Sequence, residues 1–161
     1  MKLLSDHLFM ESPLGWLNIT GDKDAIWSIS FKELEEESSR RIPPVLMDCS
    51  DQLRAYFEGT LRDFDVPVRL NGTLFQRQVW GLLAKIPFGR TVSYSDLARL
   101  LSNEGAVRAV GMANSKNPLA IILPCHRVIG TDGQLTGYAG GIWRKKWLLA
   151  HEMKSAQGSL F

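Results

Sequence analysis

Apolar and polar residues alternate along the first third of the chain, which is the pattern of half-buried β-strands. The alternation covers residues 7–12 (HLFMES), 15–20 (GWLNIT) and 25–31 (AIWSISF). Residues 12–15 (SPLG), which connect the first two stretches, are typical of a turn. We therefore predict three strands here, the first two joined by that turn.

The pattern then changes three times before residue 71. Residues 32–44 (KELEEESSRRIPP) are charged and end in two prolines, which predicts an exposed loop. Residues 47–60 (MDCSDQLRAYFEGT) carry apolar side chains at helical spacing and close near a glycine, a common helix C-cap. Residues 63–70 (DFDVPVRL) predict a last strand, which Pro67 restricts to the edge of the sheet because proline has no N–H to donate.

Helical periodicity follows from Asn71 onward. The expected helices are residues 73–89 (TLFQRQVWGLLAKIPFG), ending at Pro87, then 93–102 (SYSDLARLLS), 106–116 (AVRAVGMANSK) and 141–154 (GIWRKKWLLAHEMK). The second and third of these are short and are joined by a turn that contains a glycine. This arrangement resembles a helix-turn-helix.

The third expected helix is rich in small residues. A recognition helix in the major groove normally carries several side chains that reach base edges. A helix of small residues can instead lie close to a nucleic-acid backbone or in a narrow groove, or it can pack closely against the protein interior. The pattern leaves both interpretations open for the small residues Ala106, Ala109, Gly111, Ala113 and Ser115.

The change of periodicity predicts an α+β protein with two domains, a sheet and helix in residues 1–70 and a mainly helical domain in residues 71–161. Charge follows the same division. Residues 1–70 hold 8 Lys and Arg against 13 Asp and Glu, a net charge of −5, whereas residues 71–161 hold 11 against 4, a net charge of +7. The basic half suggests a polyanionic partner.

Other features limit the class of protein. The N-terminus is a poor signal peptide, and no apolar window approaches the roughly 20 residues that span a bilayer, so we expect a cytoplasmic protein without membrane contact. The two cysteines are not expected to form a disulfide in a reducing compartment. No CxxC or HxxxH spacing is present, so we expect no metal site.

Cys125 and His126 are the strongest candidates for chemistry, because a cysteine becomes nucleophilic when a base or a positive charge favours its thiolate. In a turn, the two neighbouring side chains could converge through a water molecule. An orienting carboxylate would complete the set. Glu152 is one candidate among only four acids of the basic half. The alternative is that Cys125 is a buried core residue.

The stretch IILPCHRVIG (121–130), followed by GQLTGYAGG (133–141), resembles the active-site signature of the O6-alkylguanine-DNA alkyltransferases, also called methylated-DNA–protein-cysteine methyltransferases. The resemblance extends over most of residues 73–153, through FGRTVSYSDLARLL, AVRAVGMANSKNPLA and KKWLLAHE. Residues 1–70 match the family only in general style. The resemblance implies a small ribonuclease H-like N-terminal domain, followed by a mainly helical domain with a helix-turn-helix.

The resemblance also implies the reaction. The O6-alkyl group of guanine, and that of O4-alkylthymine, would pass irreversibly to Cys125 after the nucleotide has been flipped out of the duplex. His126 would act as the base through a bridging water, and Glu152 would hold the imidazole. Asn117 would secure the turn before the cysteine, and Tyr94 would hydrogen-bond the flipped guanine. The thioether product would end the protein's activity after one turnover, with no cofactor or metal.

The implied partner is double-stranded DNA, bound in the minor groove with little dependence on sequence. The protein would act as a monomer, with cooperative binding on DNA as a further possibility. Arg108 would fill the gap that the flipped nucleotide leaves. Around the guanine, the backbone carbonyl of Val128 would accept a hydrogen bond from the amino group. The other pocket residues would be Tyr138, Ala139 and Gly140. Many relatives have serine at the position of Ala139. The implied DNA contacts are Arg108, Tyr94, Ser95, Ala106, Ala109, Gly111 and Ser115.

Each of these residues also has a plainer interpretation. Asn117 could simply end a helix before Pro118, Tyr94 could be a half-buried aromatic residue, and Arg108 could be solvated. Three other functions fit parts of the pattern: a Cys–His hydrolase, a DNA-binding module that recognises alkylguanine without removing the alkyl group, and a helix-turn-helix regulator. The regulator would tolerate Cys125→Ser, and the hydrolase would need an oxyanion hole.

Overall fold

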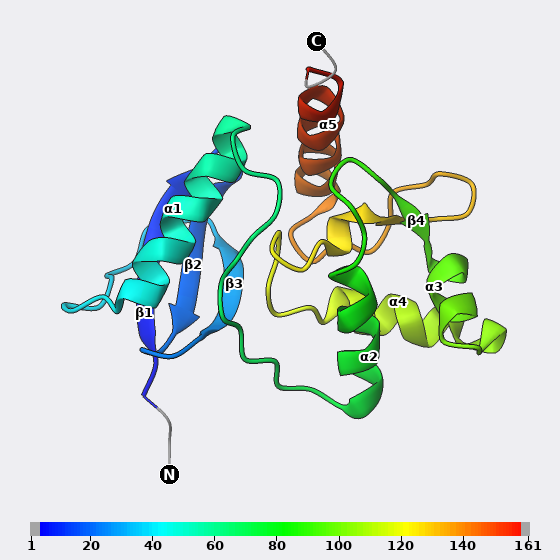
Figure 1. Cartoon of the computed structure of the whole chain (residues 1–161), viewed down its shortest axis with the longest axis horizontal. Coiled ribbons are helices and arrows are strands. Elements are labelled where there is room, and N and C mark those ends of the chain that lie inside the picture. The colour runs from blue at the N-terminus through cyan, green and yellow to red at the C-terminus, as the bar shows by residue number, and fades with distance from the viewer. Residues whose placement is uncertain (1–3, 159–161) are drawn as a thin grey trace. The chain divides into compact units, whose positions relative to one another are not determined.

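The computed structural model describes residues 4–158 and divides the chain into two compact units, residues 1–70 and residues 71–161. Figure 1 shows a sheet with one helix in the first unit and a mainly helical second unit. This architecture is the α+β fold that the sequence predicts. Among the residues described, no helix is both long enough and apolar enough to cross a membrane.

The first unit contains an antiparallel sheet of three strands in the order β1-β2-β3. The strands are β1 (Asp6–Ser12), β2 (Gly15–Gly21) and β3 (Ile26–Lys32), and they confirm the three strands predicted from alternation. The turn between β1 and β2 requires a left-handed residue, and Gly15 supplies it with φ of 96°. Leu17 and Ile19 of the central strand are fully buried.

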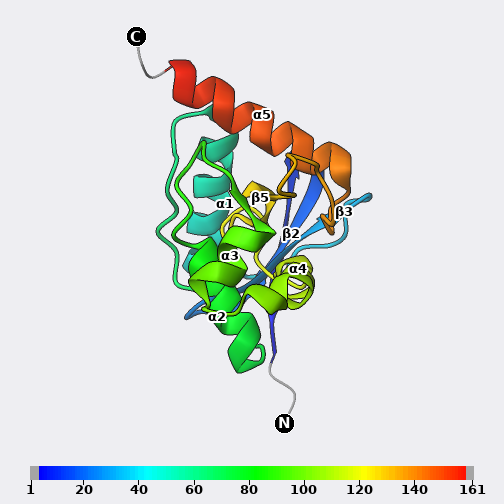
Figure 2. The same ribbon diagram turned by 90° about the vertical axis from the view of Figure 1, so that its right-hand side faces the viewer.

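Helix α1 (Pro44–Glu58) packs against the sheet and begins three residues before the predicted helix. The reason is Pro44, whose fixed φ and missing N–H suit the first position of a helix. The helix ends at Gly59, with φ of 85°, as predicted. Figures 1 and 2 show α1 lying along the sheet. Its buried residues are Leu46, Cys49, Ser50, Leu53 and Tyr56.

The predicted strand over residues 63–70 is wrong. This segment makes only an isolated parallel bridge, in which Ile26 N donates to Pro67 O at 2.8 Å and Arg69 N donates to Ile26 O at 2.9 Å. Asp65 N donates instead to Gln52 Oε1 on α1, and proline has no N–H with which to extend a ladder. The segment therefore follows the sheet without joining it as a strand.

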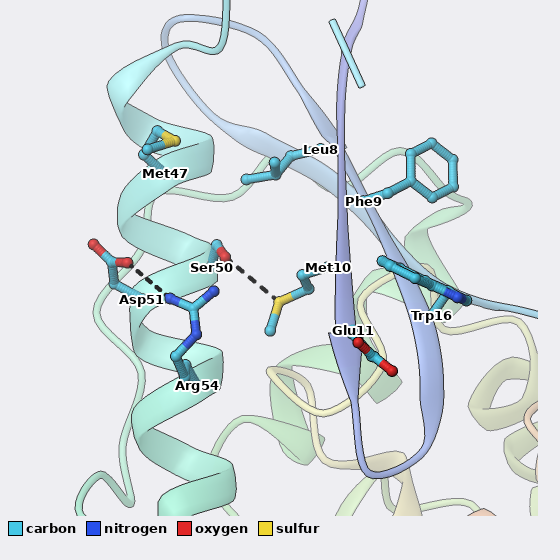
Figure 3. A pocket seen from close by; sticks show the side chains of 9 residues that line it. All are labelled: Leu8, Phe9, Met10, Glu11, Trp16, Met47, Ser50, Asp51 and Arg54. Atoms are coloured by element: carbon cyan, nitrogen blue, oxygen red, sulfur yellow. Dashed lines mark hydrogen bonds and ion pairs between the residues drawn. The ribbon is translucent and has the colours of Figure 1, made fainter. Parts of the chain in front are cut away.

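The predicted loop is confirmed, because residues 33–43 contain neither helix nor strand. Its Ser38 and Ser39 accept hydrogen bonds from the backbone of Phe9 and His7 at the outer edge of β1. Farther along this edge, a hollow of about 450 Å³ lies beside α1 (Figure 3). Its lining includes neither a cysteine nor a histidine: the residues are Leu8, Phe9, Met10, Glu11, Trp16, Met47, Ser50, Asp51 and Arg54.

The second unit is built from four α-helices and short connecting elements. These are α2 (Leu74–Leu83), β4 (Val92–Ser93), α3 (Tyr94–Leu100), η1 (Glu104–Ala106), α4 (Val107–Ser115), η2 (Cys125–Arg127), β5 (Val128–Ile129) and α5 (Ile142–Gly158). The four predicted helices are confirmed, although α2 ends at Leu83, earlier than predicted. Within this unit, α2 and α5 lie at opposite ends, with β5 between them (Figures 1 and 2).

Two of these helices begin with a capping box. Thr73 Oγ1 accepts from Gln76 N, and the Gln76 side chain accepts from Thr73 N. Ser93 and Asp96 form the same reciprocal pair at the start of α3. Each box satisfies two backbone N–H groups that would otherwise lack a partner in the first helical turn. The second box also fixes the position of Tyr94, the first residue of α3.

We expect Thr73→Ala to lower the free energy of unfolding by about 1 kcal/mol, because the substitution leaves the Gln76 N–H without its cap. Urea unfolding followed by circular dichroism measures the change. Thr73→Ser, which keeps the hydroxyl, is the control and should stay within about 0.5 kcal/mol of the parent protein. Equal losses in the two variants would contradict the role of the cap.

Candidate active site around Cys125

Cys125 opens the 3₁₀ turn η2, which follows Pro124. The preceding chain forms a tight turn, in which Leu123 N donates to Leu119 O and Ile121 adopts a left-handed φ of 74°. The Asn117 side chain fixes this turn at both ends. Its Oδ1 accepts from Leu119 N at 2.9 Å, and its Nδ2 donates to Leu123 O at 2.7 Å. The asparagine therefore determines where the cysteine lies.

The Cys125 thiol is almost enclosed, with 7 % of the residue exposed. Burial raises its pKa, while the Asn117 side chain and the Lys145 ammonium oppose that rise. The free thiol is therefore the favoured form at neutral pH. A base must remove its proton before the sulfur can act as a strong nucleophile.

His126 is fully buried beside this thiol. Its Nε2 lies 2.7 Å from Glu152 Oε2, whereas its Nδ1 is buried without a hydrogen-bond partner. Burial lowers the pKa of His126, so the ring is neutral at neutral pH. An ionised carboxylate at Nε2 selects the tautomer with hydrogen on Nε2, and this leaves Nδ1 with a free lone pair. The ring can therefore accept a proton at Nδ1.

The Glu152 carboxylate is buried, but it is well supplied with donors. Arg127 donates Nε to Oε1 at 2.8 Å and Nη2 to Oε2 at 3.0 Å, and Gly89 N donates to Oε1 at 3.1 Å. Burial raises the pKa of Glu152, but the hydrogen bonds from His126 and Arg127 outweigh burial and hold the pKa far below its usual value. The carboxylate is therefore ionised at neutral pH. A bidentate arginine pair of this kind also fixes its orientation.

Tyr94, Thr136 and Lys145 form a second cluster near the thiol. The Tyr94 hydroxyl donates to Thr136 O at 3.0 Å, and Lys145 Nζ donates to the same carbonyl at 3.0 Å. Lys145 is fully buried, and burial lowers its pKa to about 8. Burial also raises the pKa of Tyr94, so the phenol keeps its proton and remains a donor.

The four residues expected around the guanine lie in two short segments. Val128 is fully buried in β5, directly after η2. Tyr138 and Gly140 are buried before α5, whereas Ala139 between them is exposed. Arg144 Nη1 donates to Gly140 O at 2.8 Å and supports this segment from the first turn of α5.

Four of the seven residues expected to contact DNA lie on α4, two lie on α3, and Ala106 lies in η1. Arg108, Ala109 and Ser115 are exposed, whereas Ala106 is buried. Ser95 is half-buried, with its Oγ 3.3 Å from Thr131 Oγ1. A groove of about 390 Å³ lies beside α4, lined by Tyr94, Val107, Arg108, Gly111, Met112, Ser115, Thr136 and Gly137. Tyr94 belongs both to the groove and to the cluster near the thiol.

The structure brings Cys125, His126, Glu152 and Asn117 together, and it places Tyr94 close to them. It also shows four buried polar residues of the second unit that the sequence patterns did not indicate: Asn114, Arg127, Arg144 and Lys145. Arg127 directly follows the Cys-His pair, so its position was a usable signal. Asn114 and Lys145 lie in helices among other polar residues, and no local pattern distinguishes them.

No group of three or more His, Cys, Asp or Glu within residues 4–158 could hold a metal ion. Both cysteines, Cys49 and Cys125, are free and buried. The chemistry available from the chain itself is therefore that of a buried thiol beside a neutral imidazole.

Known proteins match both units of the chain. Residues 74–154 match the family described as "6-O-methylguanine DNA methyltransferase, DNA binding domain", and residues 7–70 match "6-O-methylguanine DNA methyltransferase, ribonuclease-like domain". The methylated-DNA–protein-cysteine methyltransferase of Mycobacterium tuberculosis is 46 % identical over 155 residues, with 94 % of each chain covered. That of Methanosarcina acetivorans is 43 % identical over 151 residues, covering 91 % of this chain and 97 % of the relative.

Solved structures agree with these matches. The crystal structure of the O6-methylguanine methyltransferase of M. tuberculosis superposes with a TM-score of 0.85 at 44 % identity, with 94 % of each chain covered. The crystal structure of the M. tuberculosis protein in complex with DNA gives a TM-score of 0.84 at 45 % identity, with 92 % of this chain and 93 % of that chain covered.

A ribonuclease-like domain followed by a DNA-binding domain with a buried Cys-His-Glu set defines the class of protein. It is a methyltransferase that moves a methyl group from DNA to a cysteine of its own chain. The chain belongs to the O6-methylguanine-DNA methyltransferase family, the methylated-DNA–protein-cysteine methyltransferases. The activity of this family is the direct reversal of DNA damage, in which an alkyl group on DNA is transferred to a cysteine of the protein.

We expect Glu152→Gln to lower the free energy of unfolding at pH 7.5 by about 3 kcal/mol, because it leaves the buried Arg127 guanidinium without its counter-charge. The folded-state pKa of Glu152 is lowered, so its stabilising effect is present above the unfolded value of 4.5 and is lost as pH falls through the folded value. The difference between the two proteins should therefore shrink by about 1 kcal/mol from pH 4.5 to pH 3.5.

Urea unfolding at several pH values measures this difference. Glu58→Gln, at the exposed end of α1, is the matched control and should change stability by less than about 0.5 kcal/mol. A Glu152→Gln penalty that does not depend on pH would show that the carboxylate is not ionised in the folded protein.

Proposed function

We propose that Cys125 Sγ is the atom that accepts the alkyl group. The observation that carries this assignment is the neighbouring His126, whose buried Nδ1 has no partner while its Nε2 is held by Glu152. A buried polar atom without a partner is costly, so a water molecule between Nδ1 and the thiol is the natural occupant of this position. The thiol proton then has a path to the imidazole.

The proposed step transfers one alkyl carbon. The Cys125 thiol gives its proton through water to His126 Nδ1, and the ionised Glu152 stabilises the imidazolium that forms. The sulfur forms a bond to the alkyl carbon as the bond from that carbon to guanine O6 breaks. The electron pair of the broken bond stays on guanine, to which the Tyr94 hydroxyl donates a hydrogen bond, and the proton that left the thiol passes from His126 through water to the guanine ring. The thioether is stable, so each protein molecule acts once.

The substrate is proposed to be O6-alkylguanine, and also O4-alkylthymine, flipped out of double-stranded DNA. The alkyl carbon lies inside the stacked duplex, where a protein sulfur cannot reach it. The groove on α4 supports a minor-groove contact, because its small residues allow close approach and Arg108 is exposed where it could fill the vacated stack. The net charge of +7 on residues 71–161 supports binding through phosphates with little sequence preference.

Entry of the base requires a change from the arrangement in the structure. Cys125 is 7 % exposed and is not part of the lining of the α4 groove. Tyr94 and Lys145 both donate to Thr136 O, and Tyr94 and Thr136 line the groove. We propose that the arriving base replaces the Thr136 carbonyl as the partner of Tyr94, with Val128, Tyr138, Ala139 and Gly140 around it.

The proposed site needs only one copy of the protein, because every group in it comes from residues 71–161 of one chain. We therefore propose that the protein acts as a monomer, and that neighbouring copies can still bind cooperatively along DNA. A cytoplasmic location is consistent with the two free thiols, since a reducing compartment preserves the acceptor cysteine.

Intact-mass measurement after incubation with a duplex that contains one O6-methylguanine tests the proposal. The protein should gain the mass of one methylene group, once per molecule, and Cys125→Ala should gain nothing. Cys49→Ala is the matched control, because it also removes a buried thiol but should keep the gain. A gain that persists in Cys125→Ala would refute the assignment.

Arg108→Ala tests the role of the exposed arginine in flipping. The rate of transfer from duplex DNA should fall about tenfold or more, because unstacking a base costs a few kcal/mol and the variant no longer fills the gap. The rate on a single-stranded oligonucleotide should change by less than about twofold, because no partner strand leaves a gap there. Arg54→Ala, in the first unit, is the control, and equal losses on both substrates would count against a role in flipping.

A further inference from the structure

Helix α4 carries one large apolar side chain that the proposed reaction does not use. Met112 is 63 % exposed. It lies four residues after Arg108, so the two side chains share one face of the helix. The other exposed residues of α4, Ala109 and Ser115, have short side chains. A single exposed methionine needs no explanation in itself, so its surroundings decide whether it has a role.

Met112 lines the groove of about 390 Å³ together with Arg108. The lining residues that the structure describes include this arginine and no carboxylate, which suits a polyanion. Ser115 Oγ donates to Met112 O at 2.7 Å, so the serine hydroxyl bends back onto its own helix. Met112 is therefore the longest apolar side chain on the face of α4 that is proposed to meet DNA.

The spacing of the two long side chains indicates which part of the DNA Met112 would meet. An α-helix rises about 1.5 Å per residue, so Met112 lies about 6 Å along the axis from Arg108. Base pairs follow one another at about 3.4 Å. With Arg108 in the gap and the helix along the minor groove, Met112 lies about two base pairs from the flipped nucleotide. Methionine is among the apolar residues that minor-groove proteins press into the DNA.

The chemistry of the groove floor gives this contact a preference. Both kinds of base pair present acceptor atoms in the minor groove, and G·C pairs add the 2-amino group of guanine, a donor. The methionine side chain has only a weakly accepting sulfur with which to meet that donor. Covering the amino group with Met112 therefore removes its water without replacing the hydrogen bond, which costs free energy.

We infer that Met112 is a specificity-determining residue, whose side chain lies against the floor of the minor groove about two base pairs from the lesion and disfavours a guanine 2-amino group there. This inference rests on the proposed function. Binding through phosphates remains indifferent to sequence. Met112 adds a modest dependence of the repair rate on the base pairs beside the lesion, with A·T pairs favoured over G·C pairs.

A double-mutant cycle between Met112 and the DNA tests the inference. Second-order rate constants for methyl transfer are measured for the parent protein and for Met112→Ala. Each duplex contains one O6-methylguanine, with either guanine–cytosine or inosine–cytosine pairs at the three positions on each side. Inosine lacks only the 2-amino group. The parent protein should react about fivefold faster with the inosine duplex, and this ratio should fall about threefold in Met112→Ala.

The ratio separates the side chain from the stability of the duplex. Inosine also weakens base pairing, but that effect is common to both proteins and cancels in the cycle. An equal ratio in the parent protein and in Met112→Ala would overturn the inference. Met112→Gln should also lower the ratio, because its amide oxygen can accept from the 2-amino group, and a ratio as high as that of the parent protein would contradict the contact.

Met153→Ala is the matched control, because it makes the same substitution at an exposed position of α5. It should keep the ratio of the parent protein, and thermal melting should show that every variant folds. The duplexes are short enough to hold one protein molecule. An effect of Met112→Ala that appears only on long duplexes would place Met112 at a contact between neighbouring copies and would also overturn the inference.

The result separates this inference from the proposed function. A parent protein that gains no methylene mass from O6-methylguanine refutes the proposed function itself. A parent protein that gains it, together with a cycle that shows no coupling between Met112 and the 2-amino groups, refutes only the role of Met112.

Discussion

One buried carboxylate organises the reactive half of this protein. Glu152 on α5 receives hydrogen bonds from Arg127 and Gly89 and holds His126 at 2.7 Å. An unpaired carboxylate could not remain ionised in such a place, because desolvation would raise its pKa. Here the donors outweigh desolvation, so the charge persists and selects the imidazole tautomer. The free lone pair on Nδ1, on which the proposed chemistry depends, is a consequence of that charge.

In this structure the Cys125 thiol keeps its proton and is almost enclosed. Burial raises the pKa of Cys125, and only 7 % of the residue is exposed. A protein that acts once per molecule is wasted by any side reaction of its sulfur. In the proposed reaction, a thiol that keeps its proton until a base arrives is protected, and the neutral His126 allows activation without a permanent thiolate.

Helix α4 has an exposed face and a buried face with different side chains. The exposed face of α4 carries Arg108 and small residues along the groove, whereas its buried face carries Val110, Ala113 and Asn114. The buried face confirms that some of the small residues pack against the protein interior, as Ala113 does, whereas contact of the exposed face with DNA stays a proposal.

Short-range patterns determined the secondary structure: alternation predicted β1, β2 and β3, and helical spacing predicted the five α-helices. The strand expected at residues 63–70 failed because its backbone bonds elsewhere, to Gln52 and to Ile26, and alternation cannot report such partners. The signature around Cys125 was visible because those residues are contiguous. The ion pair of Arg127 with Glu152, and the burial of Lys145 and Asn114, became visible only in the tertiary structure, since burial and long-range hydrogen bonds, not neighbours in the chain, give a polar side chain its role.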